Sequence, residues 1–271
     1  MNICIAGKND IAVDVCQYVV EHCQDAHVYA LINRDEKGED GWQRSYLKYI
    51  LLEPRVILST LEEMYRIEEL VFVSTEYDRI IKPHFFKTKW LYNIHFSLLP
   101  AYKGVYPSVW PILNGEQYAG VTLHEMEQGI DTGDIIAQKR IKLSGKETSY
   151  SLYHRCIKEG TALVIKNLDK LINHSYKAYS QSAIGSTYYS KKSIDYSNFT
   201  IDLKATATQI DRQIRAFYFP VFQLPQVLTY PIKQTKITKE KSMMAPGTLV
   251  KETSSWLKIA TIDYNIILYK A

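Results

Sequence analysis

Residues 91–104 read LYNIHFSLLPAYKG, and this stretch decides how the fold is interpreted. Its start is apolar and suits a buried strand, yet Asn93 and His95 lie two positions apart at the end of that run. Because side chains alternate between the two faces of a strand, Asn93 and His95 point to the same side. Ligands of open α/β sheets bind beyond the carboxyl ends of the strands. The polar pair is therefore a candidate reaction centre.

Short apolar runs alternate with helix-like stretches on the N-terminal side of this segment. We predict buried strands at residues 2–7, 27–33, 68–75 and 89–95. Residues 10–23 have the apolar spacing of a helix, with Asp10 as its N-cap. Strands that alternate with helices indicate an α/β fold with a mostly parallel sheet.

On the C-terminal side we expect a helix, two consecutive strands and a long helix. They are predicted at residues 108–115, 119–126, 135–143 and 148–173. A tight loop with Gly129 and Gly133 joins the two strands, and these glycines allow a sharp backbone course.

The character of the sequence changes near residue 177, where serine and tyrosine become frequent and periodicity is lost. A short helix is predicted at 205–217, and the charged stretch KQTKITKEK at 233–241 is interpreted as a loop. Residues 247–271 alternate apolar and polar side chains, which is typical of a small β unit. We place a domain boundary near residues 180–200.

The bulk composition excludes several classes of protein. With 33 basic and 29 acidic residues, a net charge of +4 is too small for a dedicated nucleic-acid binder. No apolar run approaches the roughly 20 residues of a membrane-spanning helix. The four cysteines lack the spacing of a zinc site. We therefore expect a cytoplasmic protein with reduced thiols, no metal, and no nucleic-acid or membrane partner.

Three residue types that suit acyl transfer occur in this order along the chain. His95 can accept a proton near neutral pH, and the amide of Asn93 can donate a hydrogen bond to a developing oxyanion. Asp131, in the glycine-containing loop, would orient an imidazole and raise its basicity if the two came close. Taken singly, a strand histidine is more often a satisfied core residue, and Asp-Thr-Gly-Asp is an ordinary turn. Spacing alone leaves open whether the three residues meet.

The combination NIHFSLLPAYKG and GVTLHEMEQGIDTGDIIAQ resembles the folate-dependent N-formyltransferase family over residues 1–180. The resemblance implies a Rossmann-like formyltransferase fold and a formyl group donated by 10-formyltetrahydrofolate to an amine. It also implies that His95 takes the amine proton, Asn93 steadies the tetrahedral oxyanion, and Asp131 orients or protonates. His124 recurs in the family pattern, but we expect it to be structural.

The resemblance also predicts the domains and the donor site. Residues 1–185 would form the catalytic domain, and 186–271 a small C-terminal region with a short helix and a β unit that forms a homodimer. The residues expected to bind the folate are Ser97, Leu98, Leu99, Pro100, Tyr77, Ile80, Gly129 and Asp134. Most would do so through backbone groups, which suit the amide-like edge of a pterin.

For the acceptor amine, the segment KGVYPSVWPILNG resembles enzymes that formylate dTDP-linked 3-amino- or 4-amino-dideoxyhexoses for surface polysaccharide such as O-antigen. Residues 214–222, IRAFYFPVF, resemble the part of those enzymes that closes over the nucleotide. The residues expected to bind the nucleotide sugar are Lys8, Asn9, Tyr102, Lys103, Tyr218 and Phe222. A plain packing role of the aromatic residues in the C-terminal unit is the competing interpretation.

Several alternatives stay open at this point. Val105 and Tyr106 depart from the arginine-containing pattern of the methionyl-tRNA and UDP-4-amino-arabinose formyltransferases, which disfavours these two acceptors. A binding protein without activity would not need Asn93, His95 and Asp131 together. The sequence does not choose between the C3 and C4 amino group, between gluco and galacto sugars, or between dTDP, UDP and GDP.

Overall fold

The computed structural model describes residues 1–271, which divide into two compact units. The first unit comprises residues 1–104, 120–141 and 155–188, and the second comprises 105–119, 142–154 and 189–271. Both units are therefore assembled from segments that lie far apart in the sequence.

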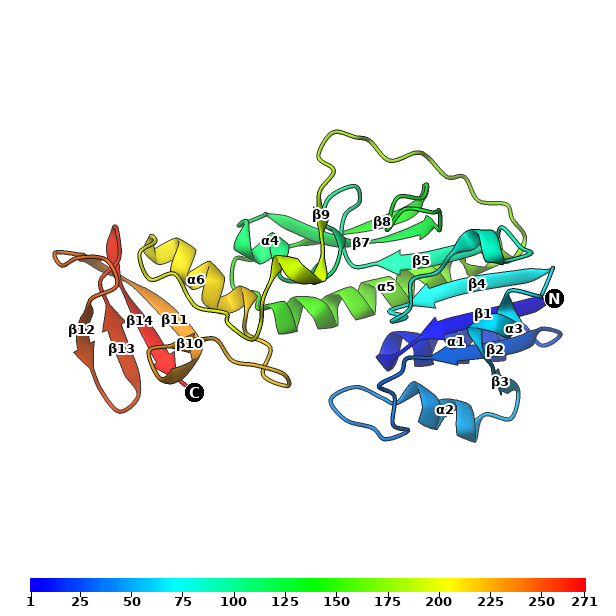
Figure 1. Ribbon diagram of the computed structural model, residues 1–271, viewed down its shortest axis with the longest axis horizontal. Helices are drawn as coiled ribbons and strands as arrows, with labels where there is room; N and C mark the ends of the chain where they lie inside the picture. The colour runs from blue at the N-terminus through cyan, green and yellow to red at the C-terminus, as the bar shows by residue number, and fades with distance from the viewer. The chain divides into compact units, whose positions relative to one another are not determined.

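A seven-stranded sheet forms the body of the first unit, with the strand order β3-β2-β1-β4-β5-β7-β8 (Figure 1). The strands are β1 (Asn2–Gly7), β2 (His27–Ile32), β3 (Val56–Leu58), β4 (Leu70–Thr75), β5 (Leu91–His95), β7 (Tyr118–Glu125) and β8 (Ile135–Lys142). The pairs from β3 to β5 are parallel, and β5 pairs with β7 in antiparallel orientation. The predicted α/β fold with a mostly parallel sheet is confirmed.

The sequence explains why this sheet forms. In β4 all six residues are buried, as expected for a strand that is covered on both faces of a parallel sheet. The helices that connect or follow these strands are α1 (Asn9–His22), α2 (Tyr46–Leu52), α3 (Leu61–Met64), η1 (Pro83–Phe85) and α5 (Ser149–Ile172). No helix in the chain combines the length and the apolarity that crossing a membrane requires.

The predicted N-cap of α1 is wrong. The cap position is Lys8, with an extended backbone, and Asp10 lies inside the first turn. The Asp10 carboxylate instead accepts a hydrogen bond from Nε of Arg44 at 2.7 Å. An acidic residue in the first turn still favours the helix through its dipole.

The second unit contains a five-stranded antiparallel sheet with the order β10-β11-β14-β13-β12. Its strands are β10 (Gln226–Val227), β11 (Tyr230–Lys241), β12 (Leu249–Glu252), β13 (Trp256–Ile259) and β14 (Tyr264–Lys270). The helices of this unit are α4 (Trp110–Leu113), η2 (Lys191–Ser193) and α6 (Ala207–Ala216), and α6 packs against β11. Two short strands, β6 (Lys103–Gly104) and β9 (Tyr188–Tyr189), pair separately.

The interpretation of residues 233–241 as a loop is wrong, because they form most of β11. This strand pairs with β14, whereas β10 covers only its first two residues. Most of β11 therefore has one open edge, where natural sheets place lysines to prevent pairing with another chain. The charges that suggested a loop are those of a protected edge strand.

Candidate active site

The candidate site lies where β5 ends, in the first unit. β5 pairs with β7 so that Asn93 is opposite His124 and His95 is opposite Thr122. The loop after β7 carries Asp131 back to the same place. The antiparallel register thus gathers side chains from positions 93 to 131 around one end of β5.

His95 is held between two oxygen atoms. Its side chain is 8% exposed, and Nδ1 lies 3.5 Å from Oδ2 of Asp131. On the other side, Nε2 lies 2.8 Å from the carbonyl oxygen of Tyr102. A carbonyl oxygen only accepts, so this contact is a hydrogen bond in the form of the ring that carries a proton on Nε2. Asp131 faces Nδ1, so Nε2 is the ring nitrogen that remains for an incoming group, which would replace the contact with Tyr102.

Asp131 is a buried anion with several partners. Its Oδ2 accepts a hydrogen bond from the backbone N–H of Gly104 at 2.8 Å, and its Oδ1 lies 3.6 Å from Nε2 of His124. Burial on its own would raise the pKa of Asp131, but the charge of His95 and the contacts with His124 and Gly104 hold that pKa well below its usual range. The carboxylate is consequently ionised at neutral pH.

The loop that carries Asp131 is built with local strain. Asp131 has a φ of +53°, in the left-handed region that non-glycine residues rarely adopt. At Gly133 a Cβ atom would lie 1.9 Å from the carbonyl oxygen of Glu125, so only glycine fits there. The two ends of the loop can approach so closely because of this residue.

His124 belongs to the same cluster, although the sequence analysis expects it to be structural. Its Nδ1 lies 2.6 Å from the carbonyl oxygen of Glu125, so Nδ1 donates. In the neutral ring Nε2 then accepts, and it lies 3.1 Å from Nδ2 of Asn93. Asn93 Nδ2 also lies 3.4 Å from Oδ1 of Asp131. The strand alternation of GVTLH is the sequence signal that puts His124 on the same face as Thr122, whereas the pairing with β5 is a property of the fold.

The segment Ser97–Pro100 is held in shape by hydrogen bonds to residues outside it. Ser97 Oγ donates to the carbonyl of Ala101 at 2.6 Å, and the Leu99 N–H donates to Oγ1 of Thr122 at 3.1 Å. The Leu99 carbonyl accepts from Gln138 at 2.8 Å. Both backbone groups of Leu99 thus already have protein partners, so this residue shapes the turn.

The other residues predicted for the folate differ in exposure. Ile80 is 71% exposed. Gly129 is also exposed, whereas Tyr77, Leu98 and Asp134 are half-buried. Burial raises the pKa of Tyr77 to about 12, so its hydroxyl is a hydrogen-bond donor at neutral pH.

The residues predicted for the nucleotide sugar fall into both units. Tyr102 and Lys103 lie in the first unit beside the site, and Nζ of Lys103 donates to Oγ of Ser186 at 3.2 Å. Lys8 and Asn9 also lie in this unit, at the start of α1, and Asn9 has a φ of +62°.

Tyr218 and Phe222 belong to the second unit. The Phe222 side chain is 70% exposed and stacks on Phe219 with 5.3 Å between ring centroids. The carbonyl of Tyr218 accepts from Oγ of Ser149 at 3.0 Å. An exposed aromatic face is thus present in the predicted segment.

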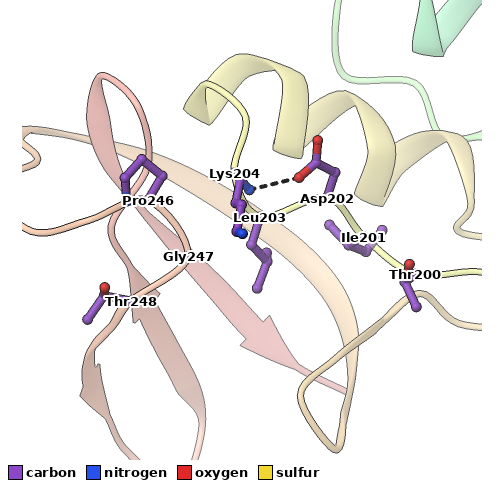
Figure 2. A pocket seen from close by; sticks show the side chains of 8 residues that line it. All are labelled: Thr200, Ile201, Asp202, Leu203, Lys204, Pro246, Gly247 and Thr248. Carbon is purple, nitrogen blue, oxygen red and sulfur yellow. Dashed lines mark hydrogen bonds between the residues drawn. The ribbon is translucent and has the colours of Figure 1, made fainter.

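The second unit also has a hollow of about 730 Å³, shown in Figure 2. Its lining residues are Thr200, Ile201, Asp202, Leu203, Lys204, Pro246, Gly247 and Thr248. None of them is a predicted site residue, and the Asp202 carboxylate already accepts the backbone N–H of Lys204 at 2.9 Å. The chain contains no group of three histidine, cysteine or acidic side chains arranged to hold a metal ion.

Comparison with known families gives two matches. Residues 5–168 match the formyl transferase family, and residues 193–271 match the formyl transferase C-terminal domain.

Two solved structures are similar along the whole chain. One is an N-formyltransferase from Helicobacter canadensis in complex with folinic acid and dTDP-3-aminofucose, with 38% identity, a TM-score of 0.91 and coverage of 99% of each chain. The other is WlaRD, a sugar 3N-formyl transferase solved in the presence of dTDP and 5-N-formyl-THF. It has 40% identity and a TM-score of 0.90, and the match covers 100% of this chain and 97% of that one.

Curated relatives match over shorter stretches. Methionyl-tRNA formyltransferase from Coxiella burnetii is 32% identical over 62% of this chain and 54% of its own length. GDP-perosamine N-formyltransferase from Brucella melitensis is 35% identical over 58% of this chain and 60% of its own length. The chain therefore spans little more than half the length of these relatives.

Proposed function

Because the chain belongs to the formyl transferase family, we propose that it transfers a formyl group from 10-formyltetrahydrofolate to the 3-amino group of a dTDP-linked amino-dideoxyhexose. The observation that carries this proposal is the buried contact between His95 and Asp131 at the end of β5, 3.5 Å apart. Such an ion-paired imidazole beside an amide donor suits acyl transfer to an amine.

In the proposed reaction the amine nitrogen attacks the formyl carbon of the donor. In the neutral His95 ring with its proton on Nδ1, facing Asp131, Nε2 carries no proton and accepts the one that the amine loses. The bond between the formyl carbon and N10 of the folate then breaks, and the same proton passes to N10. Atoms and charge balance without any metal or redox partner.

Asn93 donates a hydrogen bond to the oxyanion of the tetrahedral intermediate in this proposal. Its amide nitrogen faces His124 and Asp131. One of its two N–H groups exchanges its present partner for the oxyanion. The remaining contact keeps the amide in orientation. A donor fixed in this way needs little reorganisation when the negative charge develops.

For the donor, we propose that the folate lies against the turn Ser97–Pro100 and the loops around Tyr77 and Gly129. Support comes from the two similar solved structures, which hold folinic acid and 5-N-formyl-THF respectively. Because the backbone groups of Leu99 are already paired, we assign that turn a shaping role and leave pterin recognition to its neighbours.

For the acceptor, the two solved structures favour a dTDP-linked sugar with its amino group at C3. Within the first unit, Lys8 and Lys103 are the groups that we assign to the diphosphate. Methionyl-tRNA is a second candidate, because a curated relative with that activity matches part of the chain. GDP-linked perosamine is favoured by the other curated relative.

We further propose that the chain acts as a homodimer in the cytoplasm and supplies a sugar for surface polysaccharide. All four cysteines are free, which suits a reducing compartment.

In the second unit Met243 is 92% and Ile262 is 60% exposed, and the Ser242 N–H donates to the carbonyl of Asp263 between them. An apolar surface of this kind is typical of an interface with a second copy. Comparing the sedimentation of Met243→Glu with that of the unchanged chain tests the proposed dimer.

The test of the activity is a panel of acceptors with 10-formyltetrahydrofolate. It contains dTDP-3-amino- and dTDP-4-amino-dideoxyhexoses, GDP-perosamine, UDP-4-amino-arabinose and methionyl-tRNA, and mass spectrometry detects the added formyl group. We expect the 3-amino sugar to be formylated and His95→Ala to abolish the product. Formylation of methionyl-tRNA alone would overturn the sugar assignment, and binding of folate and sugar without any product would indicate a binding protein.

A further inference from the structure

A long segment joins α5 to β9 (Figure 1). It contacts the candidate site at two places. We name residues 174–187 the strap. Its Tyr179 forms an isolated antiparallel bridge with Ile135, the first residue of β8. In sequence this stretch is serine- and tyrosine-rich and lacks periodicity. All contacts described below lie within the first unit.

The first contact is made by Gln181. Its Nε2 donates to the carbonyl oxygen of Asp131 and to the carbonyl oxygen of Gly133, each at 2.8 Å. Two carbonyl oxygens can only accept, so the atom that faces them has to be the amide nitrogen. The Gln181 side chain therefore ties two peptide groups of the loop that carries Asp131 to the strap.

This arrangement has a local cost. Oε1 of Gln181 is buried and has no hydrogen-bond partner. A buried acceptor left unpaired destabilises the fold. Asp131, the residue that Gln181 holds, also has the strained φ of +53°. Two unfavourable features at one loop point to a functional demand on its geometry, because neither contributes to stability.

The second contact is made by Thr187. Its Oγ1 accepts the backbone N–H of Tyr102 at 2.7 Å, and its carbonyl accepts the N–H of Lys103 at 2.9 Å. The carbonyl of Tyr102 is the atom that faces Nε2 of His95 at 2.8 Å. Thr187 thus fixes the peptide that limits where Nε2 can lie.

We infer that the strap is a positioning element: Gln181 and Thr187 set the distance and orientation of the His95–Asp131 pair from its two sides. Gln181 acts on Asp131 through the loop carbonyls, and Thr187 acts on His95 through Tyr102. Neither residue touches the reacting atoms. The inference deepens the proposed function and rests on it for its kinetic consequences only.

The test uses variants that remove one hydrogen-bonding group and keep the shape. Gln181→Met removes both hydrogen bonds that the Gln181 amide donates. Thr187→Val removes the hydroxyl acceptor of the Tyr102 N–H, and Thr187→Ser keeps it. We expect kcat to fall about 10- to 100-fold in Gln181→Met and Thr187→Val, with KM for either substrate changed less than about threefold, because small misplacements mainly affect the chemical step. Thr187→Ser should restore kcat. Ile184→Ala, at a strap residue that is 89% exposed, is the matched control and should leave kcat unchanged.

A second readout needs no substrate. The carboxyl carbon of Asp131 is followed by NMR as the pH is lowered, and Asp131→Asn assigns its signal. In Gln181→Met we expect the pKa of Asp131 to move up toward its ordinary value, because the loop no longer holds the carboxylate between His95, His124 and the Gly104 N–H. A purely structural role would lower the melting temperature and leave both kcat and this titration unchanged.

The outcomes separate the two hypotheses. If the unchanged chain formylates an amino sugar and Gln181→Met keeps its kcat and its Asp131 titration, the positioning inference is overturned. If the unchanged chain formylates nothing, the proposed function fails. The NMR titration then decides the inference alone: a shifted pKa of Asp131 supports it, and an unshifted one overturns it.

Discussion

Two strands of this chain place polar side chains among apolar ones, and they use them in opposite ways. In β5, His95 is buried, and its ring faces Asp131 and the Tyr102 carbonyl. In β11, the lysines of the stretch 233–241 are all exposed. The partners of a polar side chain, and not its polarity, distinguish a candidate reaction centre from a protected edge.

The difference also explains why the two stretches were interpreted with different success. Residues 91–95 are apolar except at two positions, so the polar pair stands out against a strand. The charges of β11 hide its alternation, although Ile232 is fully buried. We therefore expect substitutions at the end of β5 to change mainly the activity, and substitutions in the core of β11 to change mainly the stability.

The largest effect is expected at the end of β5. His95→Ala removes the proposed base, and loss of a general base typically costs about 100- to 10,000-fold in rate. We expect kcat to fall within this range, as measured by mass spectrometry of the formylated sugar. An active His95→Ala protein would remove β5 as the reaction centre and end the contrast with β11.

The core of the second sheet should show the reverse behaviour. Ile232→Ala removes a side chain that is 0% exposed, and such truncations cost roughly 2–5 kcal/mol of unfolding free energy. We expect urea unfolding to show this loss, with kcat unchanged at temperatures where the variant is folded. A large loss of kcat without loss of stability would place β11 among the elements that act in catalysis.

A substitution in the Asp131 loop should affect both quantities. In Gly133→Ala the new Cβ would lie 1.9 Å from the Glu125 carbonyl oxygen, so the loop has to move. Overpacking of this kind costs roughly 1–3 kcal/mol. We expect a lower melting temperature together with a reduced kcat, whereas Gly41→Ala, at an open position without a positive φ, should leave kcat unchanged.

The unfolding free energy should depend on acid pH through Asp131, which lies at the end of β5. Because its pKa is lowered by folding, the ionised carboxylate stabilises the fold above its unfolded pKa of about 3.9, and this contribution is lost as the pH falls through its folded pKa. The stability of the unchanged chain should fall below about pH 4 more steeply than that of Asp131→Asn, by up to about 1.4 kcal/mol per pH unit. Parallel curves from urea unfolding at several pH values would contradict the ionised, paired state of Asp131.

The smallest effect is expected on the exposed face of β11. Lys236→Glu changes a solvent-exposed charge on the partly open edge strand, and such substitutions typically stay within about 0.5 kcal/mol. We expect unchanged kcat and nearly unchanged unfolding free energy, and light scattering should show no aggregation. If Lys236→Glu altered kcat, the lysines of β11 would have a role beyond edge protection.

Much of the site could be predicted because it rests on local patterns. The two-residue period of a strand puts Asn93 and His95 on one face, and the glycines at 129 and 133 mark the sharp loop that carries Asp131. Continuous apolar runs identified four of the five parallel strands, since both of their faces are covered, but not the three-residue strand β3. These features depend only on residues that are close together in the chain.

What only the tertiary structure decided are contacts between residues far apart in sequence. The register of β5 against β7 places His124 beside Asn93, and the strap brings Gln181 to the carbonyl of Asp131, fifty positions away. No local period encodes such pairs, because strand register and loop packing are set by the burial of the whole sheet. The sequence by itself determined the class of fold and the candidate side chains Asn93, His95 and Asp131, and the long-range packing decided their partners.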